Sequence, residues 1–264
     1  MSDMTTSQLS ARFDKEWLKR ASQSIQHPLT RALLVLTFTT GLVDAVSYLG
    51  LGRVFTANMT GNIVLLGFGI AGGVGLPVLA PLVSLGSFLL GAAGGGVLAK
   101  RMGERHPEHI ARALAIEVSL IGIAAGLAAA LTVRPNAVSG DIVIALLAFA
   151  MGVRNATVRR IGVPDLTTTV LTMTLTGLAA DSPVAGGSGK GSVRRIAAVL
   201  AMLTGALAGA LLLKTSLALP LAAAAGLALL TWLVYIPAAR RGLSAQRRAS
   251  ASLSARRARS PEQT

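Results

Sequence analysis

The fold of this chain is decided by residues 41–67, which read GLVDAVSYLGLGRVFTANMTGNIVLLG. An apolar run, Ala32–Leu51, ends inside this stretch, and a second one, Val54–Gly72, begins only two residues later. A helix needs about 20 apolar residues to cross the roughly 30 Å hydrocarbon core of a membrane, so the first run has the length of a span. The second run carries polar or small residues in its first half, namely Thr56, Asn58, Thr60, Gly61 and Asn62. This pattern predicts a membrane segment whose helix is broken or turns back.

The composition of the whole chain fits an integral membrane protein. Of 264 residues, 52% are hydrophobic and only 14% are charged, whereas a soluble domain carries about 25% charged residues. Such a chain is too apolar to be disordered, and it argues against a soluble enzyme because its apolar surface could not be covered. The net charge of +14 alone would also suit a nucleic-acid binder. The absence of cysteine excludes disulfides and thiolate metal sites.

Six further apolar runs follow along the chain. They are Val78–Ala99, Ala113–Thr132, Ile142–Ile161, Leu166–Ala180, Ile196–Thr215 and Leu217–Ile236. The run Leu166–Ala180 is too short for a simple span and is rich in threonine. Its six threonines are Thr167, Thr168, Thr169, Thr172, Thr174 and Thr176. The runs predict an all-α polytopic membrane protein, either with six spans plus two broken or re-entrant segments or with eight spans.

The distribution of Lys and Arg favours six spans. If the two polar runs enter and leave the membrane on the same side, 22 of the 25 basic residues fall on one side, and only Arg53, Arg134 and Lys214 fall on the other. Eight spans would give about 16 against nine. Cytoplasmic loops are enriched in Lys and Arg, so we expect both termini in the cytoplasm. In this count Arg154, which lies inside a span, is assigned to the cytoplasmic side by proximity.

The two halves of the chain resemble each other. The stretch 41–45 parallels 152–156, and 59–62 parallels 171–174. The next span of each half carries a pair of glycines four residues apart, Gly91 with Gly95 and Gly205 with Gly209, which should let helices pack closely. The following span again carries small residues, at 122 and 126 and at 222 and 226. Three spans in each half predict two inverted repeats, 32–132 and 140–237, an arrangement typical of secondary transporters.

These motifs carry a family resemblance. The stretch 41–67 and the stretch 150–181, AMGVRNATVRRIGVPDLTTTVLTMTLTGLAAD, resemble the YoaK family of bacterial multi-pass membrane proteins of unknown function. The resemblance extends over roughly residues 30–240. It implies an inner (plasma) membrane protein and supplies no substrate.

The leading candidate for a functional side chain is Asp44, which lies deep in the first span, where a charge is costly and needs a partner or a role. It shares a helix face with Tyr48. We interpret Asp44 as a protonatable or cation-binding carboxylate; the alternative is a structural carboxylate bonded to Tyr48 or paired with Arg154. Arg154 and Asn155 occupy the matching place in the second half. Arg154 would neutralise Asp44 or Glu117, bind an anion, or extend its guanidinium to the membrane interface.

Two polar sets complete the candidate pathway. Asn58, Thr60 and Asn62 alternate along the chain, as do Thr172, Thr174 and Thr176. An unwound stretch would turn each set toward one cavity, and the alternative is that these side chains join helices by hydrogen bonds.

The remaining acids read as structural. We interpret Glu117 as an interfacial residue near Arg112. Asp141 and Asp165 stand where a carboxylate would cap a helix.

The sequence favours a secondary transporter of a small polar solute, an ion or a proton. The alternative is a scaffold or assembly factor that transports nothing. No enzyme, cofactor or metal site is expected, since no span holds a histidine to serve a nucleophile and the sequence Ser188–Gly191 departs from a phosphate-binding loop.

The two ends of the chain are polar. Residues 1–31 are an N-terminus with a possible interfacial helix, 32–237 form the membrane domain, and 238–264 are a basic, partly disordered tail. The tail would attract anionic lipid. It lacks the aromatic residues of a nucleic-acid site.

Overall fold

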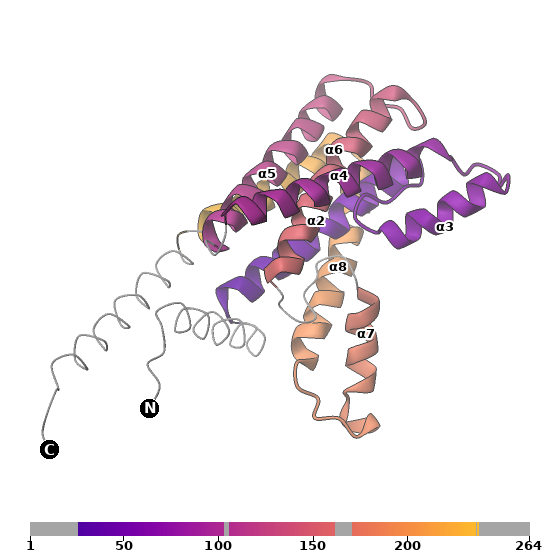
Figure 1. Cartoon of the computed structure of the whole chain (residues 1–264). Coiled ribbons are helices and arrows are strands. Elements are labelled where there is room, and N and C mark those ends of the chain that lie inside the picture. Colours follow the sequence, from indigo (N-terminus) through magenta and orange to yellow (C-terminus); the bar gives the residue numbers. More distant parts are fainter. Residues whose placement is uncertain (1–25, 103–105, 162–170, 236, 238–264) are drawn as a thin grey trace, which may run out of the picture.

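The computed structural model of the chain describes residues 26–102, 106–161, 171–235 and 237. The predicted interfacial helix and the basic tail therefore lie outside the described residues. Within them, all regular structure is helical (Figure 1). The helices are α2 (Pro28–Gly50), α3 (Met59–Ile70), α4 (Leu79–Met102), α5 (His106–Ala130), α6 (Val138–Ile161), α7 (Leu171–Ala180), a short 3-10 turn η1 (Pro183–Ala185), α8 (Ser192–Leu213) and a last helix, Ala218–Tyr235. The predicted all-α class is confirmed.

Six helices in the described part of the chain are long and apolar enough to cross a membrane. They are α2, α4, most of α5 and α6, α8 and the last helix. The two polar runs form only short helices, because α3 has 12 residues and α7 has 10. At 1.5 Å per residue these reach about 18 Å and 15 Å, well short of the roughly 30 Å core. The long helices correspond to the six expected spans.

Two helix pairs cross at glycines, α2 with α8 and α4 with α6. A Cβ on Gly41 of α2 would lie 2.6 Å from the backbone nitrogen of Ala206 on α8. A Cβ on Gly152 of α6 would lie 2.8 Å from the backbone nitrogen of Ala92 on α4. Real Cβ atoms do not approach other atoms so closely, so only glycine permits this contact between backbones.

The glycine pairs of α4 and α8 make matching contacts. Gly91 abuts the backbone of Phe149, and Gly205 abuts that of Phe38. One turn later, a Cβ on Gly95 would lie 3.0 Å from the Cβ of Ala156, and one on Gly209 would lie 2.9 Å from that of Ala45. The predicted close packing at these two glycine pairs is confirmed. The pair 122 and 126 differs, because a Cβ added there meets nothing within 4 Å.

The glycine contacts of one crossing therefore have counterparts in the other. Gly152 follows Gly41 by 111 residues, and Phe149 follows Phe38 by the same number. Gly205 follows Gly91 by 114 residues, as Gly209 follows Gly95. Each half of the chain thus packs its first span against the second span of the other half.

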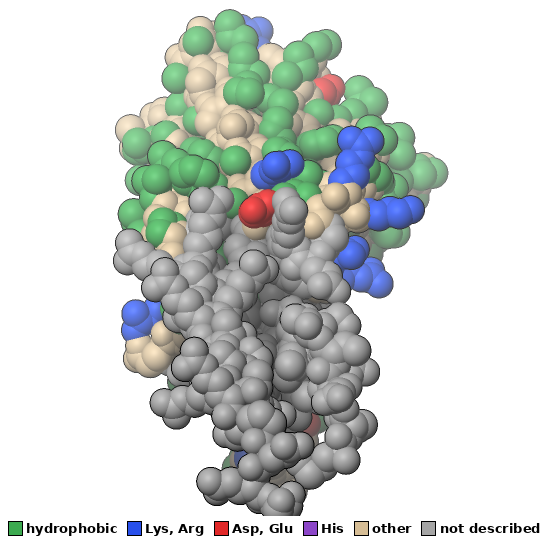
Figure 2. Space-filling model, turned by 60° about the vertical axis from the view of Figure 1, so that its left-hand side comes forward, with side chains coloured by type: hydrophobic (Ala, Val, Ile, Leu, Met, Phe, Trp, Pro, Cys, Tyr) green, Lys and Arg blue, Asp and Glu red, His purple; other side chains and the backbone are tan. Residues whose placement is uncertain are grey.

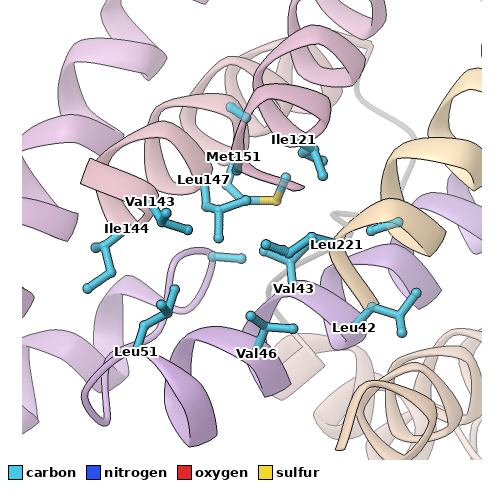
Figure 3. Close-up of a cluster of buried hydrophobic side chains, with 14 of the residues drawn as sticks. Leu42, Val43, Val46, Leu51, Ile121, Val143, Ile144, Leu147, Met151 and Leu221 are labelled. Atoms are coloured by element: carbon cyan, nitrogen blue, oxygen red, sulfur yellow. The ribbon is translucent and has the colours of Figure 1, made fainter. Parts of the chain in front are cut away.

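The core of the molecule forms around α2 and α6. Figure 3 shows Val43 and Val46 of α2 and Leu147 and Met151 of α6 in one buried cluster, together with Leu221 of the last helix. The outward faces are apolar as well, and α8 exposes Leu200, Leu203, Leu207 and Leu211 among others. Hydrophobic side chains cover most of the described surface in Figure 2. Exposed leucine along a spanning helix implies contact with the lipid bilayer.

Candidate functional site

The chain turns back on itself directly after α2. Gly52 and Arg53 both have positive φ angles, 125° and 56°, which reverse its direction beyond Gly50. The backbone nitrogens of Thr56 and Ala57 then donate to Oδ1 of Asp44, at 3.0 and 2.9 Å. Asp44 precedes the last residue of α2 by six residues, or about 9 Å of helix. The segment between α2 and α3 therefore runs back along α2 by about that distance.

Asp44 holds this irregular segment by satisfying its backbone. Its side chain is only 5% exposed, and the Thr56 hydroxyl adds a third contact at 3.5 Å. Backbone N–H groups outside a helix would otherwise stay unpaired at this depth, at a cost of about 1–3 kcal/mol each. Tyr48, an expected partner of Asp44, stacks instead on Phe55 with 4.9 Å between the ring centroids.

Asn62 pairs with the same segment from α3. Its amide donates to the carbonyl oxygen of Phe55 at 2.7 Å and to the hydroxyl of Ser84 at 3.1 Å, while its Oδ1 accepts from the Phe55 nitrogen at 2.8 Å. Ser84 of α4 also donates to the Phe55 carbonyl oxygen, at 2.7 Å. The Asn62 amide thus pairs with both the N–H and the carbonyl group of Phe55, as a neighbouring β-strand would. It joins the turned-back segment to α3 and, through Ser84, to α4.

Replacing Asn62 with leucine, which has a similar volume, should destabilise the protein by about 1–3 kcal/mol, because the Phe55 N–H loses its acceptor. Ser84 would still serve the Phe55 carbonyl group. The measurement is the unfolding free energy in mixed detergent micelles. Thr60→Val, at an exposed position of the same helix, is the matched control and should change stability by no more than about 0.5 kcal/mol. Equal effects of the two changes would show that the Asn62 contacts do not support the segment.

The structure separates the predicted set of Asn58, Thr60 and Asn62. α3 is a regular helix from Met59, so the alternating residues do not share one side. Asn58 is the N-cap of this helix, and its Oδ1 accepts from the Gly61 nitrogen at 3.3 Å. Asn58 and Thr60 are exposed, whereas Asn62 is fully buried.

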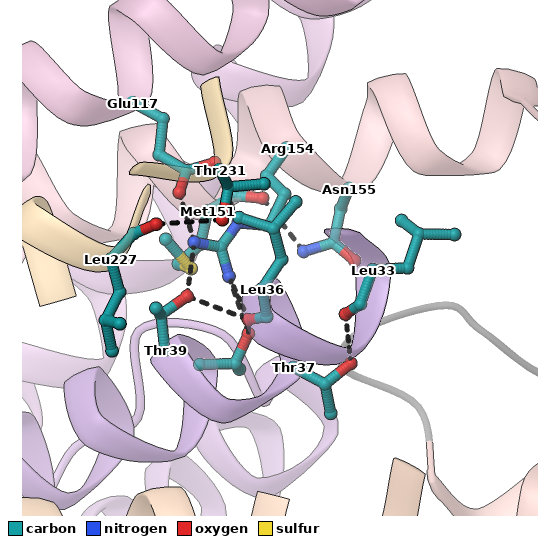
Figure 4. A network of polar contacts seen from close by, with 11 residues as sticks. Leu33, Leu36, Thr37, Thr39, Glu117, Met151, Arg154, Asn155, Leu227 and Thr231 are labelled. Carbon is teal, nitrogen blue, oxygen red and sulfur yellow. Dashed lines mark hydrogen bonds and ion pairs between the residues drawn. The ribbon is translucent and has the colours of Figure 1, made fainter. Parts of the chain in front are cut away.

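A second polar cluster surrounds Arg154 of α6, as Figure 4 shows. Its Nε donates to Oε2 of Glu117 on α5 at 2.8 Å, and its Nη2 pairs with the other carboxylate oxygen. Its remaining contacts go to α2: the Leu36 carbonyl oxygen at 2.8 Å, the Thr40 hydroxyl at 2.7 Å and the Thr39 hydroxyl at 3.0 Å. These five contacts match the five N–H groups of a guanidinium.

Two interpretations are corrected by this cluster. Glu117 is 1% exposed and bound to Arg154, so its placement at the interface near Arg112 was wrong. Arg154 is 2% exposed and does not reach the interface, and of its proposed partners the structure selects Glu117. Since all its donors are engaged within the protein, Arg154 offers none to an anionic solute.

The contribution of α2 to this cluster was missed from the sequence. Leu36, Thr40 and Asp44 follow one another at four-residue intervals, so they lie on one face of α2. That four-residue spacing is the feature of the sequence that could have indicated the contribution of α2. It places Thr40, which contacts Arg154, one helical turn from Asp44, which holds the turned-back segment.

The matching residues of the second half are described only in part. Asn155 donates to the Met151 carbonyl oxygen at 2.8 Å, within α6. On α7, Thr174 is buried and Thr172 is exposed, as are their counterparts Asn62 and Thr60 on α3. Residues 162–170 lie outside the described part and include Asp165 and three of the predicted threonines.

Two cavities in the described part of the chain border acidic residues named above. One of about 330 Å³ is lined by residues 75–80, Asn136 and Asp141, and Asp141 stands in the first turn of α6. The other, of about 20 Å³, lies against Glu117 and Arg154. Neither of the two is lined by Asp44 or Asn58.

Comparisons with known proteins place the chain among membrane proteins. A family model described as a protein of unknown function (DUF1275) matches residues 32–234. The UPF0700 transmembrane protein YoaK of Bacillus subtilis (strain 168) is 35% identical over 150 residues, which make up 56% of this chain and 65% of that protein. The matched part thus spans just under two thirds of that relative. No solved structure matches the chain.

Proposed function

Since the chain belongs to the DUF1275 family of proteins of unknown function, we propose its role from the site itself: a secondary transporter of a small polar solute or ion, coupled through Asp44. The resemblance to YoaK is confirmed, and the chain is a multi-pass membrane protein.

The observation that carries the proposal is the turned-back segment held by Asp44. Irregular backbone is tolerated at membrane depth only where protein surrounds it or where it lines a water-filled cavity. The exposed amide of Asn58 and the exposed hydroxyl of Thr60 follow directly on this segment. Lipid offers such groups no hydrogen bonds, so their exposure favours a water-lined path beside the start of α3.

Asp44 would couple this path to a proton or cation. As a carboxylate it accepts the N–H groups of Thr56 and Ala57 on one oxygen. A bound proton or cation would neutralise that oxygen or compete for it, and so weaken both contacts. Loading Asp44 would thereby loosen the segment that borders the path.

The matched glycine crossings support the architecture of a secondary transporter. With three spans in each half, the halves would be inverted repeats, and one half could rock against the other. We propose the inner membrane as the location, with both termini in the cytoplasm. The excess of Lys and Arg on one side supports this orientation, and it persists when the buried Arg154 is left out of the count.

A scaffold that transports nothing is the second candidate. It is favoured by the burial of Asp44 and by the complete set of contacts around Arg154. A scaffold predicts that water does not reach Asn58. The chain has no native cysteine, so single cysteines report access directly.

In proteoliposomes with an internal pH dye and a set of small polar solutes, the wild type should dissipate a proton gradient, and Asp44→Asn should reduce this flux at least tenfold. The asparagine keeps an oxygen acceptor for Thr56 and Ala57 but cannot carry the charge. Asp141→Asn changes an acid outside the proposed path and should leave the flux unaltered. Unchanged flux in Asp44→Asn would remove Asp44 from the mechanism.

The same protein separates transporter from scaffold by labelling. Cysteines at Asn58 and Ile63 both occupy exposed positions of the α3 region. A water-lined path predicts that a charged thiol reagent modifies position 58 and spares position 63, which would face lipid. A scaffold predicts no reaction at either position.

A further inference from the structure

The guanidinium of Arg154 ties three spans together at one point. It rises from α6, holds Glu117 of α5 with two donors, and holds α2 through Leu36, Thr39 and Thr40 with three (Figure 4). Both charged side chains are 2% exposed or less. Because every donor of the guanidinium is engaged inside the protein, the group links α2, α5 and α6 and leaves no donor for a solute.

A narrow seam leads to this point from the N-terminal end of α2. The cavity of about 20 Å³ beside the pair is about large enough for one water molecule. Its other walls are almost entirely apolar and include Leu29, Leu33, Leu114, Val158 and Tyr235. These residues come from α2, α5, α6 and the last helix, and the ion pair forms the polar floor between them. The seam is therefore a gap in the packing where these four helices meet.

The matching place in the first half of the chain is closed differently. Val43 precedes Arg154 by 111 residues, the spacing that relates the two glycine crossings. Val43 lies in the apolar cluster with Leu221 of the last helix (Figure 3). One half thus has a buried ion pair where the other has aliphatic contacts. An ion pair can be released by a change of charge or by water, whereas an aliphatic contact cannot.

We propose that the Arg154–Glu117 pair is the latch of the cytoplasmic gate, and that the seam beside it widens when the pair separates. This inference rests on the proposed transport function. The latch would open between Arg154 and Glu117, and the three contacts of the guanidinium to α2 would remain. α5 is then the helix that moves, and the hydrogen bond from the Trp232 indole to the Ala111 carbonyl oxygen, at 2.8 Å, carries the last helix with it.

The test measures access to the seam in inverted membrane vesicles. A cysteine at Leu114 lines the seam on α5, and a cysteine at Ile121 lies on the same helix in the central core. Each is combined with wild-type Glu117 and with Glu117→Gln. The latch predicts that Glu117→Gln raises the rate at which a small charged thiol reagent modifies position 114 at least tenfold, with no change at position 121. No rise at position 114, or equal rises at both positions, would overturn it.

A second variant guards against misfolding of Glu117→Gln. Glu117→Asp keeps the negative charge beside Arg154 and leaves the contacts of Arg154 to α2 in place. The latch therefore predicts slower labelling of position 114 in Glu117→Asp than in Glu117→Gln, and equally fast labelling would contradict it. Labelling does not require transport. A rise at position 114 in a protein without solute or proton flux would leave the latch standing and refute the transporter. Flux in the wild type without that rise would refute the latch alone.

Discussion

Arg154→Met should destabilise the protein by about 3–5 kcal/mol, the usual result of removing one partner from a buried ion pair. The change leaves the Glu117 carboxylate, 1% exposed, without its counter-ion. It also leaves the Thr39 and Thr40 hydroxyls and the Leu36 carbonyl oxygen without the donor that links them to α6. The measurement is the unfolding free energy in mixed detergent micelles, followed by circular dichroism.

The matched control for this change is Arg134→Met. Arg134 is exposed, and removing its charge should shift stability by no more than about 0.5 kcal/mol. The double change Arg154→Met with Glu117→Leu removes both charges and should recover most of the loss, because an apolar pair of similar volume often replaces a buried ion pair without penalty. If Arg154→Met were no worse than Arg134→Met, the pair would not hold the three helices together.

Gly41→Leu and Gly152→Leu should each cost on the order of 3 kcal/mol or more, at the upper end of what overpacking costs. At both positions the new side chain would collide with backbone atoms of the crossing helix, which cannot move aside as a flexible side chain can. The two crossings correspond residue by residue, so the two losses should agree within about 1 kcal/mol. The loss is read from the same unfolding transition.

Gly122→Leu is the matched control on α5. A Cβ there meets nothing within 4 Å, so the change should gain up to about 1 kcal/mol from helix propensity. A loss at Gly122 as large as that at Gly152 would mean that the crossings are not the cause.

Much of the fold could be predicted because it depends on the lengths of the apolar runs and on the spacing of the glycines. The six spans follow from uninterrupted apolar runs, and the close crossings follow from glycines four residues apart. Asp44 stands out as an acid within a span that no helix cap explains. The contacts it makes could not be predicted, since they depend on the reversal of the chain at Gly52 and Arg53.

The misplacement of Glu117 has a clear physical origin. The apolar run begins at Ala113, but α5 begins at His106, because its first two turns carry the charged residues that hydropathy excludes. Glu117 therefore lies 11 residues into the helix, or about 17 Å, and not one turn from its end. Its partner lies 37 residues away on α6, and no local pattern joins the two.

The alternation of Asn58, Thr60 and Asn62 misled for a related reason. Alternating residues share a side only in an extended chain, and the helix resumes one residue after Asn58. Asn62 instead pairs with Phe55, seven residues before it. A contact of this kind exists only once the chain has folded back.

The exchange of helices between the two halves has a consequence for how the protein is made. Gly91 and its partner Phe149 are 58 residues apart, whereas Gly205 and its partner Phe38 are separated by 167 residues. As the chain leaves the ribosome, α4 and α6 can cross first, while the glycine face of α2 is in the membrane without its partner. This face is covered only after α8 has been synthesised. Neither half forms its glycine crossing alone, so the first span of the domain is the last to reach its glycine partner.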